Sequence, residues 1–212
     1  AWEFRSSAAT SDLRSISMTS PTEGTAISYY EVLQTTDAGS TWSVQGGVPF
    51  TQTAVSFSDP SNGIIVGYGG YFRKTTNGGV GWLPYQSTGY SETLLGVQML
   101  DANTIIAVGT NGTILKTVDG GNSWTSQTSN TTNQLEGLHF VDANSGYAVG
   151  GNGTILKTTD SGVNWTVLTA GAGYPYNSWM YSVHFVNASL GFVAGNNGVI
   201  LKTTDGGLSW TL

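Results

Sequence analysis

The sequence predicts an all-β fold built from five copies of one four-stranded unit, and three observations lead to it. An eight-residue signature, Thr-x-(Asp/Asn)-x-Gly-x-x-Trp, occurs five times in the 212 residues. Its tryptophans are separated by 40, 42, 41 and 45 residues and are Trp42, Trp82, Trp124, Trp165 and Trp210. Short apolar segments that alternate with polar residues lie between the signatures. Four strands in about 40 residues are typical of propeller blades, so the predicted fold is a five-bladed β-propeller of four-stranded antiparallel blades.

The copy from residue 131 to 172 shows the strands most clearly. Apolar residues alternate along its first segment, and its third segment is rich in β-branched residues. Gly, Asn and Asp fill the turns between the segments. We expect its strands at 135–141, 147–150, 154–158 and 165–168.

The other copies repeat this order without any helical pattern, and the chain reads as a single propeller domain. The first copy departs most, with Tyr29-Tyr30 in place of Asn-Gly at the second turn. We expect blades at approximately 10–48, 49–88, 89–130, 131–172 and 173–212, the last together with residues 1–9.

The two ends of the chain compete for one repeat position. Trp2 lies 40 residues before Trp42 and, with Phe4, begins a segment like a fourth strand, whereas only two residues follow Trp210. We expect residues 2–9 to complete the last blade and close the ring. The alternative is donation of this strand to another subunit, which would build a filament by head-to-tail contacts.

The signature resembles the Asp-box, or BNR, repeat of β-propellers. The longer frame Ile-Leu-Lys-Thr-Thr-Asp-Gly-Gly-x-Ser-Trp, present at 200–210, is similar to that of the photosystem II assembly and stability factor family. The resemblance covers nearly the whole chain and implies a propeller that assists assembly without catalysis. It also implies about seven blades, and this chain has five. Sialidases and lectin-like modules carry the same repeat, so it specifies a fold more than a function.

The signature residues are expected to shape turns. The acidic or amide residue accepts backbone N–H bonds, the glycine adopts a positive φ, and the tryptophan packs against the neighbouring copy. The residues expected to clamp the turns are Asp37, Asn77, Asp119, Asp160 and Asp205. Each stands alone in its own blade, whereas hard cations need several converging oxygens, so we expect no metal or other cofactor.

Two further sets of residues recur at equivalent positions. His139 and His184 share a first-strand position in neighbouring blades, but no third metal ligand is evident. Four lysines, with Gln34 in the first copy, share a third-strand position: Lys74, Lys116, Lys157 and Lys202. Their stems cover apolar surface in the simpler interpretation, and their ammonium groups meet an acidic partner in the other.

The composition of the chain limits the kinds of partner that we expect. Charged residues make up 9% of the chain, its net charge is −6 and its bases are scattered, which argues against nucleic acid. No apolar run approaches the roughly 20 residues that cross a bilayer, so membrane insertion is not expected. Gly, Thr, Ser and Asn dominate, and the first residue is Ala1. We therefore expect an exported protein, at the cell surface, in the periplasm or in a lumen.

Five Asn-x-Ser/Thr sequons are compatible with N-glycosylation where a cell has that machinery. Two of them lie in hairpins, where repeat copying accounts for them. The sequons begin at Asn111, Asn130, Asn152, Asn164 and Asn187.

Enzyme chemistry is not expected. Resemblance to sialidases implies three converging arginines, and the only three present are Arg5, Arg14 and Arg73, the last in the third strand of its blade. The chain contains no Cys and no Gly-x-Ser-x-Gly motif. The acids outside the signatures lie in turns or stand without partners, so no glycosidase pair is apparent.

Aromatic residues gather where the repeats differ. Propeller geometry places the hairpins between second and third strands on one face with the connections between blades, and Tyr85 and Tyr90 would lie at its rim. The residues expected to form this face are Tyr29, Tyr30, Tyr68, Tyr71, Tyr174, Tyr176, Trp179 and Tyr181. Blades five, one and two are neighbours in a closed ring, so these residues would form one sector. Such rings suit a protein interface or sugar stacking.

The predicted function is a non-catalytic scaffold for protein interaction or assembly. Two alternatives remain open, a self-assembling subunit of an extracellular filament and a carbohydrate-binding surface module. The predicted partner is accordingly a protein, another copy of the chain, or a glycan.

Overall fold

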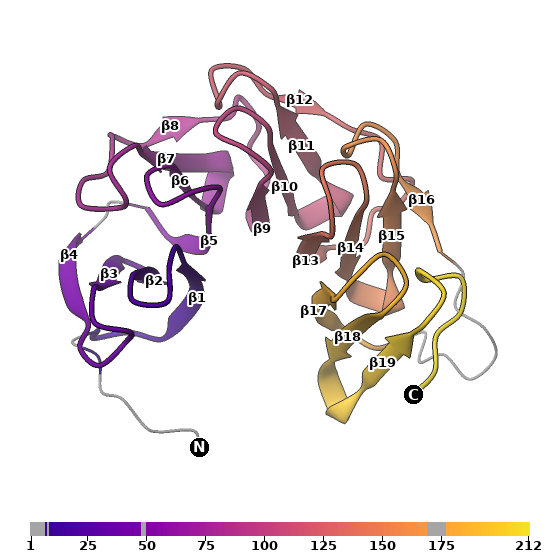
Figure 1. The fold of residues 1–212 in the computed structure, drawn as a ribbon. Helices are drawn as coiled ribbons and strands as arrows, with labels where there is room; N and C mark the ends of the chain where they lie inside the picture. The colour runs from indigo at the N-terminus through magenta and orange to yellow at the C-terminus, as the bar shows by residue number, and fades with distance from the viewer. Residues whose placement is uncertain (1–6, 8, 48–49, 169–176) are drawn as a thin grey trace.

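The computed structural model describes residues 7, 9–47, 50–168 and 177–212 and shows the predicted propeller architecture. Four antiparallel sheets have four strands each, in sequence order, and the fifth has three. The five sheets follow one another along an arc, with blade one and blade five at its two ends (Figure 1). The first strand of each blade lies innermost and contacts the first strand of the next, from β1 to β5, β9, β13 and β17.

The strands are short, as expected for blades. Blade one contains β1 (Leu13–Met18), β2 (Gly24–Ser28), β3 (Glu31–Thr35) and β4 (Ser43–Gly47). Blade two contains β5 (Gln52–Phe57), β6 (Gly63–Gly67), β7 (Tyr71–Thr75) and β8 (Gln86–Ser87). Blade three contains β9 (Leu94–Met99), β10 (Ile105–Gly109), β11 (Ile114–Thr117) and β12 (Thr125–Ser126). Blade four contains β13 (Leu135–Phe140), β14 (Gly146–Gly150), β15 (Ile155–Thr158) and β16 (Thr166–Val167), and blade five contains β17 (Met180–Phe185), β18 (Gly191–Gly195) and β19 (Ile200–Thr203).

The hairpins between second and third strands form a 3-10 turn in four blades, where no helical element was expected. The turns are η1 (Tyr68–Gly70), η2 (Thr110–Gly112), η3 (Gly151–Gly153) and η4 (Asn196–Gly198). The central residue is left-handed, with φ 57° at Asn111 and 53° at Asn152. Asn and Gly tolerate this conformation better than other residues, which explains the recurring Asn-Gly.

The core is divided into one apolar cluster for each pair of adjacent blades. The four clusters lie between blades one and two, two and three, three and four, and four and five. We call the side of a blade that contacts the preceding blade its front face and the other side its rear face. Each interior blade therefore has two covered faces. Among the described residues, β1 and β17 make no comparable contact with each other, so blades one and five have one covered face each.

Completion of the last blade by residues 2–9 stays a prediction, because most of this segment lies outside the described residues, whereas the short stub after Trp210 is described. Thr211 forms an antiparallel bridge with Lys202, with N···O distances of 2.8 and 2.9 Å. The same bridge is made by Thr125 and Lys116 in blade three. The C-terminal residues thus occupy the edge of β19 where a fourth strand belongs. Trp2 and Phe4 lie outside the described residues.

The described residues just before β1 lie against blade one. The backbone N–H of Thr10 donates to the carboxylate of Glu31, at 3.0 Å for Oε2. The Thr10 hydroxyl donates to the other carboxylate oxygen at 2.9 Å. Of the segment 2–9 only residues 7 and 9 are described, so closure of the ring by this segment is not tested.

Candidate functional site

In the signature turns, the acidic or amide side chain accepts hydrogen bonds from the residues that follow it. In blade one, Asp37 Oδ1 accepts the backbone N–H of Thr41 at 2.9 Å, and its Oδ2 accepts the Thr41 hydroxyl at 2.7 Å. Thr35 closes the turn, because its hydroxyl donates to Asp37 and accepts from the N–H of Gly39. In blade two, Asn77 Oδ1 makes the equivalent hydrogen bond and accepts the backbone N–H of Gly81 at 3.0 Å.

These hydrogen bonds stabilise the charged carboxylates. Those from the backbone and hydroxyl of Thr41 lower the pKa of Asp37 from 3.8 to about 2. Those from the backbone and side chain of Asn164 lower the pKa of Asp160 to about 2. Within the described residues, no three His, Cys, Asp or Glu side chains gather as metal ligands. The arrangement is that of a turn clamp.

The signature tryptophans pack at the front faces of their blades. Trp124 joins the cluster between blades two and three, and its ring lies 5.5 Å from that of Phe72 in blade two. Trp165 and Trp210 occupy the corresponding clusters farther along the arc. Packing against the neighbouring copy is therefore observed for these residues. Trp42, in blade one, has no preceding blade among the described residues.

The recurring lysines connect blades. Lys74 Nζ donates to the carbonyl of Gly120, and Lys157 Nζ donates to that of Gly206 at 2.8 Å. Gln34 Nε2 makes the equivalent bond to Gly78 at 2.6 Å. Each of these carbonyls belongs to the signature turn of the next blade. These three side chains therefore tie each rear face to the following turn.

The two histidines also lie at a blade junction. The rings of His139 and His184 are 4.5 Å apart, and His139 Nε2 is 3.1 Å from the carbonyl oxygen of Phe185. Burial, and then repulsion from His184, lower the pKa of His139. The pair therefore favours the neutral form of His139.

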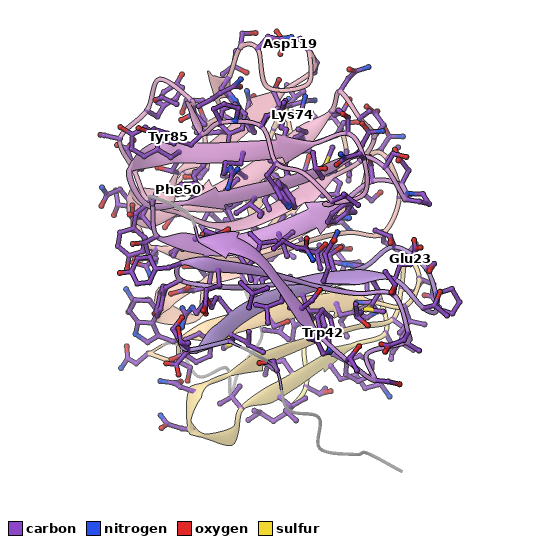
Figure 2. The ribbon with its side chains drawn as sticks, turned by 90° about the vertical axis from the view of Figure 1, so that its left-hand side faces the viewer. Glu23, Trp42, Phe50, Lys74, Tyr85 and Asp119 are labelled. Carbon is purple, nitrogen blue, oxygen red and sulfur yellow. The ribbon has the colours of Figure 1, made fainter. Side chains whose placement is uncertain are left out.

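The exposed aromatic residues form their densest group on blade two. Phe50, Tyr71 and Tyr85 lie within 6.3 Å of one another between ring centroids, with Tyr71 and Tyr85 5.3 Å apart and edge to face. We call these three residues the aromatic cluster. Tyr85 is 49% exposed and Phe50 is buried beneath the tyrosines. Figure 2 shows Phe50 and Tyr85 on one side of the molecule and Glu23, in the turn after β1, on the opposite side.

The other predicted aromatic residues of blades one and two lie on the neighbouring hairpins. Tyr68 is in η1, and the rings of Tyr29 and Tyr30 are 6.2 Å apart between β2 and β3. Arg14 lies over the ring of Tyr29, 4.8 Å from its centroid. Tyr30 and Tyr68 are about half exposed. The hairpin of blade one is joined to blade two by a backbone bond of 2.9 Å from Gln52 to Tyr29.

Trp179 and Tyr181 lie on blade five, at the opposite end of the arc from Tyr29 and Tyr30. The backbone N–H of Trp179 donates to Asn196 Oδ1 at 3.1 Å. Tyr174 and Tyr176 lie outside the described residues. The structure thus brings together the residues of blades one and two and leaves those of blade five apart from them.

A polar hollow on blade three was not anticipated from the sequence. It has a volume of about 720 Å³ and is lined by hydroxyls and amides of the η2 hairpin and of residues 126–133. Tyr90 lies between it and blade two, since its hydroxyl accepts the N–H of Ser126 and its carbonyl lies beside Gly70. Phe50 was also missed. In the sequence, the hollow corresponds only to a non-repeating run of Ser, Thr and Asn, and Phe50 is only an apolar residue in a connection between blades.

Several sequon asparagines make hydrogen bonds within the fold. The side-chain N–H groups of Asn130 and Asn164 donate to the carbonyl oxygen of Trp165 and to Asp160 Oδ2, respectively. The side chain of Asn152 donates to Asn133. These amides therefore form hydrogen bonds within the turns and beside the hollow. Asn111 lines the hollow, and Asn187 Oδ1 accepts two backbone N–H bonds in the turn after β17.

Comparison with known proteins identifies the class as a BNR-repeat propeller. Residues 126–212 match the family model described as photosynthesis system II assembly factor YCF48. The structure entitled "YCF48 bound to D1 peptide" is similar, with TM-score 0.56 and 18% identity, over 97% of this chain and 81% of that one. YCF48 from Cyanidioschyzon merolae gives 0.54 and 18%, over 96% and 85%. The chain therefore resembles YCF48, and no curated protein matches its sequence.

The same fold occurs in enzymes. An ancestral GH74 enzyme gives a TM-score of 0.74 at 17% identity, over 99% of this chain and 32% of that one. At this identity the likeness shows the fold alone. Among the described residues, no helix is long and apolar enough to cross a membrane.

Proposed function

We propose that the protein is a non-catalytic scaffold that binds an extended peptide segment of a partner protein. The aromatic cluster carries the proposal, because Tyr71 and Tyr85 are exposed over a buried Phe50 on the hairpin face. Rings with polar tips and few rotatable bonds are enriched in the central residues of protein interfaces.

The neighbouring hollow supports a peptide rather than a purely apolar ligand. The hollow presents side-chain amides and hydroxyls, which can pair with the N–H and C=O groups of an extended chain. Tyr90 connects it to blade two. An apolar side chain on the aromatic cluster with its backbone in the hollow would use both surfaces. The resemblance to YCF48, one structure of which holds a peptide, supports the same class of partner.

We further propose that the protein works outside the cytoplasm. The support is compositional, because charged residues make up 9% of the chain, against about 25% in ordinary globular domains, and Thr, Ser and Asn are abundant. A fractionation experiment on the native host, with antibody detection of the chain, tests this proposal.

Binding to an immobilised peptide library tests the function. We expect the protein to select peptides that contain an aromatic or large aliphatic residue. Tyr85→Ala and Tyr71→Ala should weaken that binding about tenfold or more, because a hot-spot residue at the centre of an interface contributes about 2 kcal/mol or more. Tyr181→Ala, which removes a similarly exposed tyrosine from blade five, is the matched control and should bind as the parent does.

The same variants distinguish the alternatives. Equal binding by Tyr85→Ala and the parent would contradict the proposed site. If Tyr181→Ala is also impaired, the sector includes blade five and the ring closes around it. Retention of one sugar class on a glycan array, lost in Trp179→Ala, would instead identify a carbohydrate-binding module.

A further inference from the structure

The two ends of the arc each expose a face that every interior blade covers. On the front face of blade one, Leu13, Ile16 and Met18 are 52%, 59% and 47% exposed. By strand pairing, Ile16 occupies the same position in its blade as Val55 and Val183, which are both 6% exposed. Its other equivalents, Val97 and Leu138, are half-buried. A large apolar residue that is exposed at a position covered in every other blade indicates a missing neighbour.

The rear face of blade five shows the same contrast. Ile200 is 61% exposed, whereas the residues at its register position are at most 2% exposed, namely Val32, Phe72, Ile114 and Ile155. Phe192 is 38% exposed, and its equivalent Tyr147 is 1% exposed. Ala194, beside these two residues, is also exposed. Three neighbouring positions of this sheet are therefore not covered by another blade.

The front face of blade one contains a depression. It has a volume of about 340 Å³, and its lining includes Ile16, Ala26, Leu33 and Trp42. In later blades, side chains of the preceding blade occupy the space beside the signature turn. A Cβ on Gly121 would lie 3.1 Å from the ring of Phe72, for example.

The rear face of blade five presents an aromatic ring at a position that makes an interblade stack elsewhere. In blade four, Tyr147 stacks on Phe185 of blade five with centroids 3.7 Å apart. Phe192 holds the position of Tyr147, and Met18 holds that of Phe185. A ring over a methionine sulfur is a favourable replacement for that stack.

The polar part of the interface is also split between the two ends. Lys157 donates to the carbonyl of Gly206 in the next blade. Lys202 holds the equivalent position in blade five and is exposed. The equivalent carbonyl in blade one belongs to Ala38. The two end faces therefore carry matching apolar positions and matching hydrogen-bonding groups.

We propose that the rear face of blade five of one copy packs on the front face of blade one of a second copy. A copy of this chain is the occupant that fits, because each end face carries the counterpart of the other in an interface that the chain already forms four times. Phe192 then lies over Met18, and Lys202 donates to the Ala38 carbonyl. No strand is exchanged. The contact is head to tail, so it propagates into a helical filament unless its rotation closes a ring.

Charge substitutions that inactivate one face each test the proposal. Ile16→Glu should inactivate the front face and Ile200→Glu the rear face, with Val118→Glu, an exposed site on blade three, as the control. In light scattering up to about 1 mM protein, the parent and the control should grow in mass with concentration. Each face variant should bind copies at least about tenfold more weakly, and an equimolar mixture of the two should stop at a dimer. Circular dichroism confirms that every variant is folded.

Single cysteines then identify the contact, because the chain contains no Cys. Met18→Cys and Phe192→Cys, mixed, should give a cross-linked dimer with a short bismaleimide, and either alone should give much less. A parent that stays monomeric at about 1 mM, or a mixture that does not dimerise, would overturn the proposal. So would a cross-link within one chain in the Met18→Cys/Phe192→Cys double variant at low concentration, because that outcome places blade one on blade five of the same copy.

Discussion

Asp160 illustrates how one side chain defines a whole turn. Its Oδ1 accepts backbone N–H groups from Val163 and Asn164 at 3.1 and 2.9 Å, and the Thr158 hydroxyl donates to the same oxygen. Asn77 makes comparable bonds in blade two without a charge. The geometry of the acceptor oxygen is therefore sufficient for the turn, and the charge adds a dependence on pH.

Acid should loosen the signature turns. The pKa of Asp160 is lowered from 3.8 to about 2, so its stabilising effect is complete above about pH 4 and is lost as the pH falls toward 2. Asp160→Asn should keep the turn, lower stability at pH 7 and flatten this part of the profile. Urea unfolding between pH 7 and 2 measures the effect. Identical slopes for the parent and the variant would contradict it.

The histidine pair should act in a separate pH range. Because the pKa of His139 is lowered from 6.5, the folded state binds fewer protons than the unfolded state below that pH. Stability is therefore greatest above about pH 6.5 and decreases as the pH falls through it. His139→Gln should weaken the decrease in unfolding experiments at pH 8 and pH 5.5. An unchanged difference between the two pH values would show that the pair is not its source.

At the scale of elements, the unit of stability is the interface between blades. Trp165 is 3% exposed in the cluster between blades three and four, and its indole N–H donates to the Gly162 carbonyl at 3.0 Å. Trp42 has the same place in the signature but lines an open depression. One residue type thus occurs in a covered and an uncovered setting.

Truncating these two tryptophans should have unequal effects. Trp165→Ala should destabilise the protein by about 3–5 kcal/mol, as expected for a buried aromatic residue that leaves a cavity. Trp42→Ala should cost clearly less when the protein is dilute. Chemical denaturation of both variants at micromolar concentration tests this, and equal losses would mean that the front face of blade one is covered.

The periodic part of the structure could be predicted and the aperiodic part could not. The strand expected at 135–141 is observed as Leu135–Phe140, because alternation and turn residues define it locally. The fourth strand expected at 165–168 is reduced to Thr166–Val167. The hollow depends on the path of residues 126–133, for which no repeat pattern exists.

The candidate site was only partly predictable for the same reason. The tyrosines of blades one and two could be placed on one face, since each hairpin has a known position in its blade. Their relation to Trp179 and Tyr181 depends on the angle between successive blades, which sequence spacing does not encode. Closure was predicted from a segment that lies mostly outside the described residues, and the described blades form an open arc.

At the scale of the molecule, the arc is a stack of five units with four interfaces. In such repeat structures stability is a sum over units and their nearest neighbours, so an end unit with one interface is less stable than an interior unit with two. Open ends also expose the faces that a second copy can cover. Association and end stability are therefore two consequences of one arrangement.

Amide hydrogen exchange, resolved blade by blade, tests this arrangement most directly. In dilute protein, exchange should be slowest in β10 and β14 of blades three and four and distinctly faster in β2 and β18 of blades one and five. Raising the concentration should slow exchange at the two ends alone. Equal protection of all five blades in dilute protein is the result that a closed ring gives, and it would contradict the open stack.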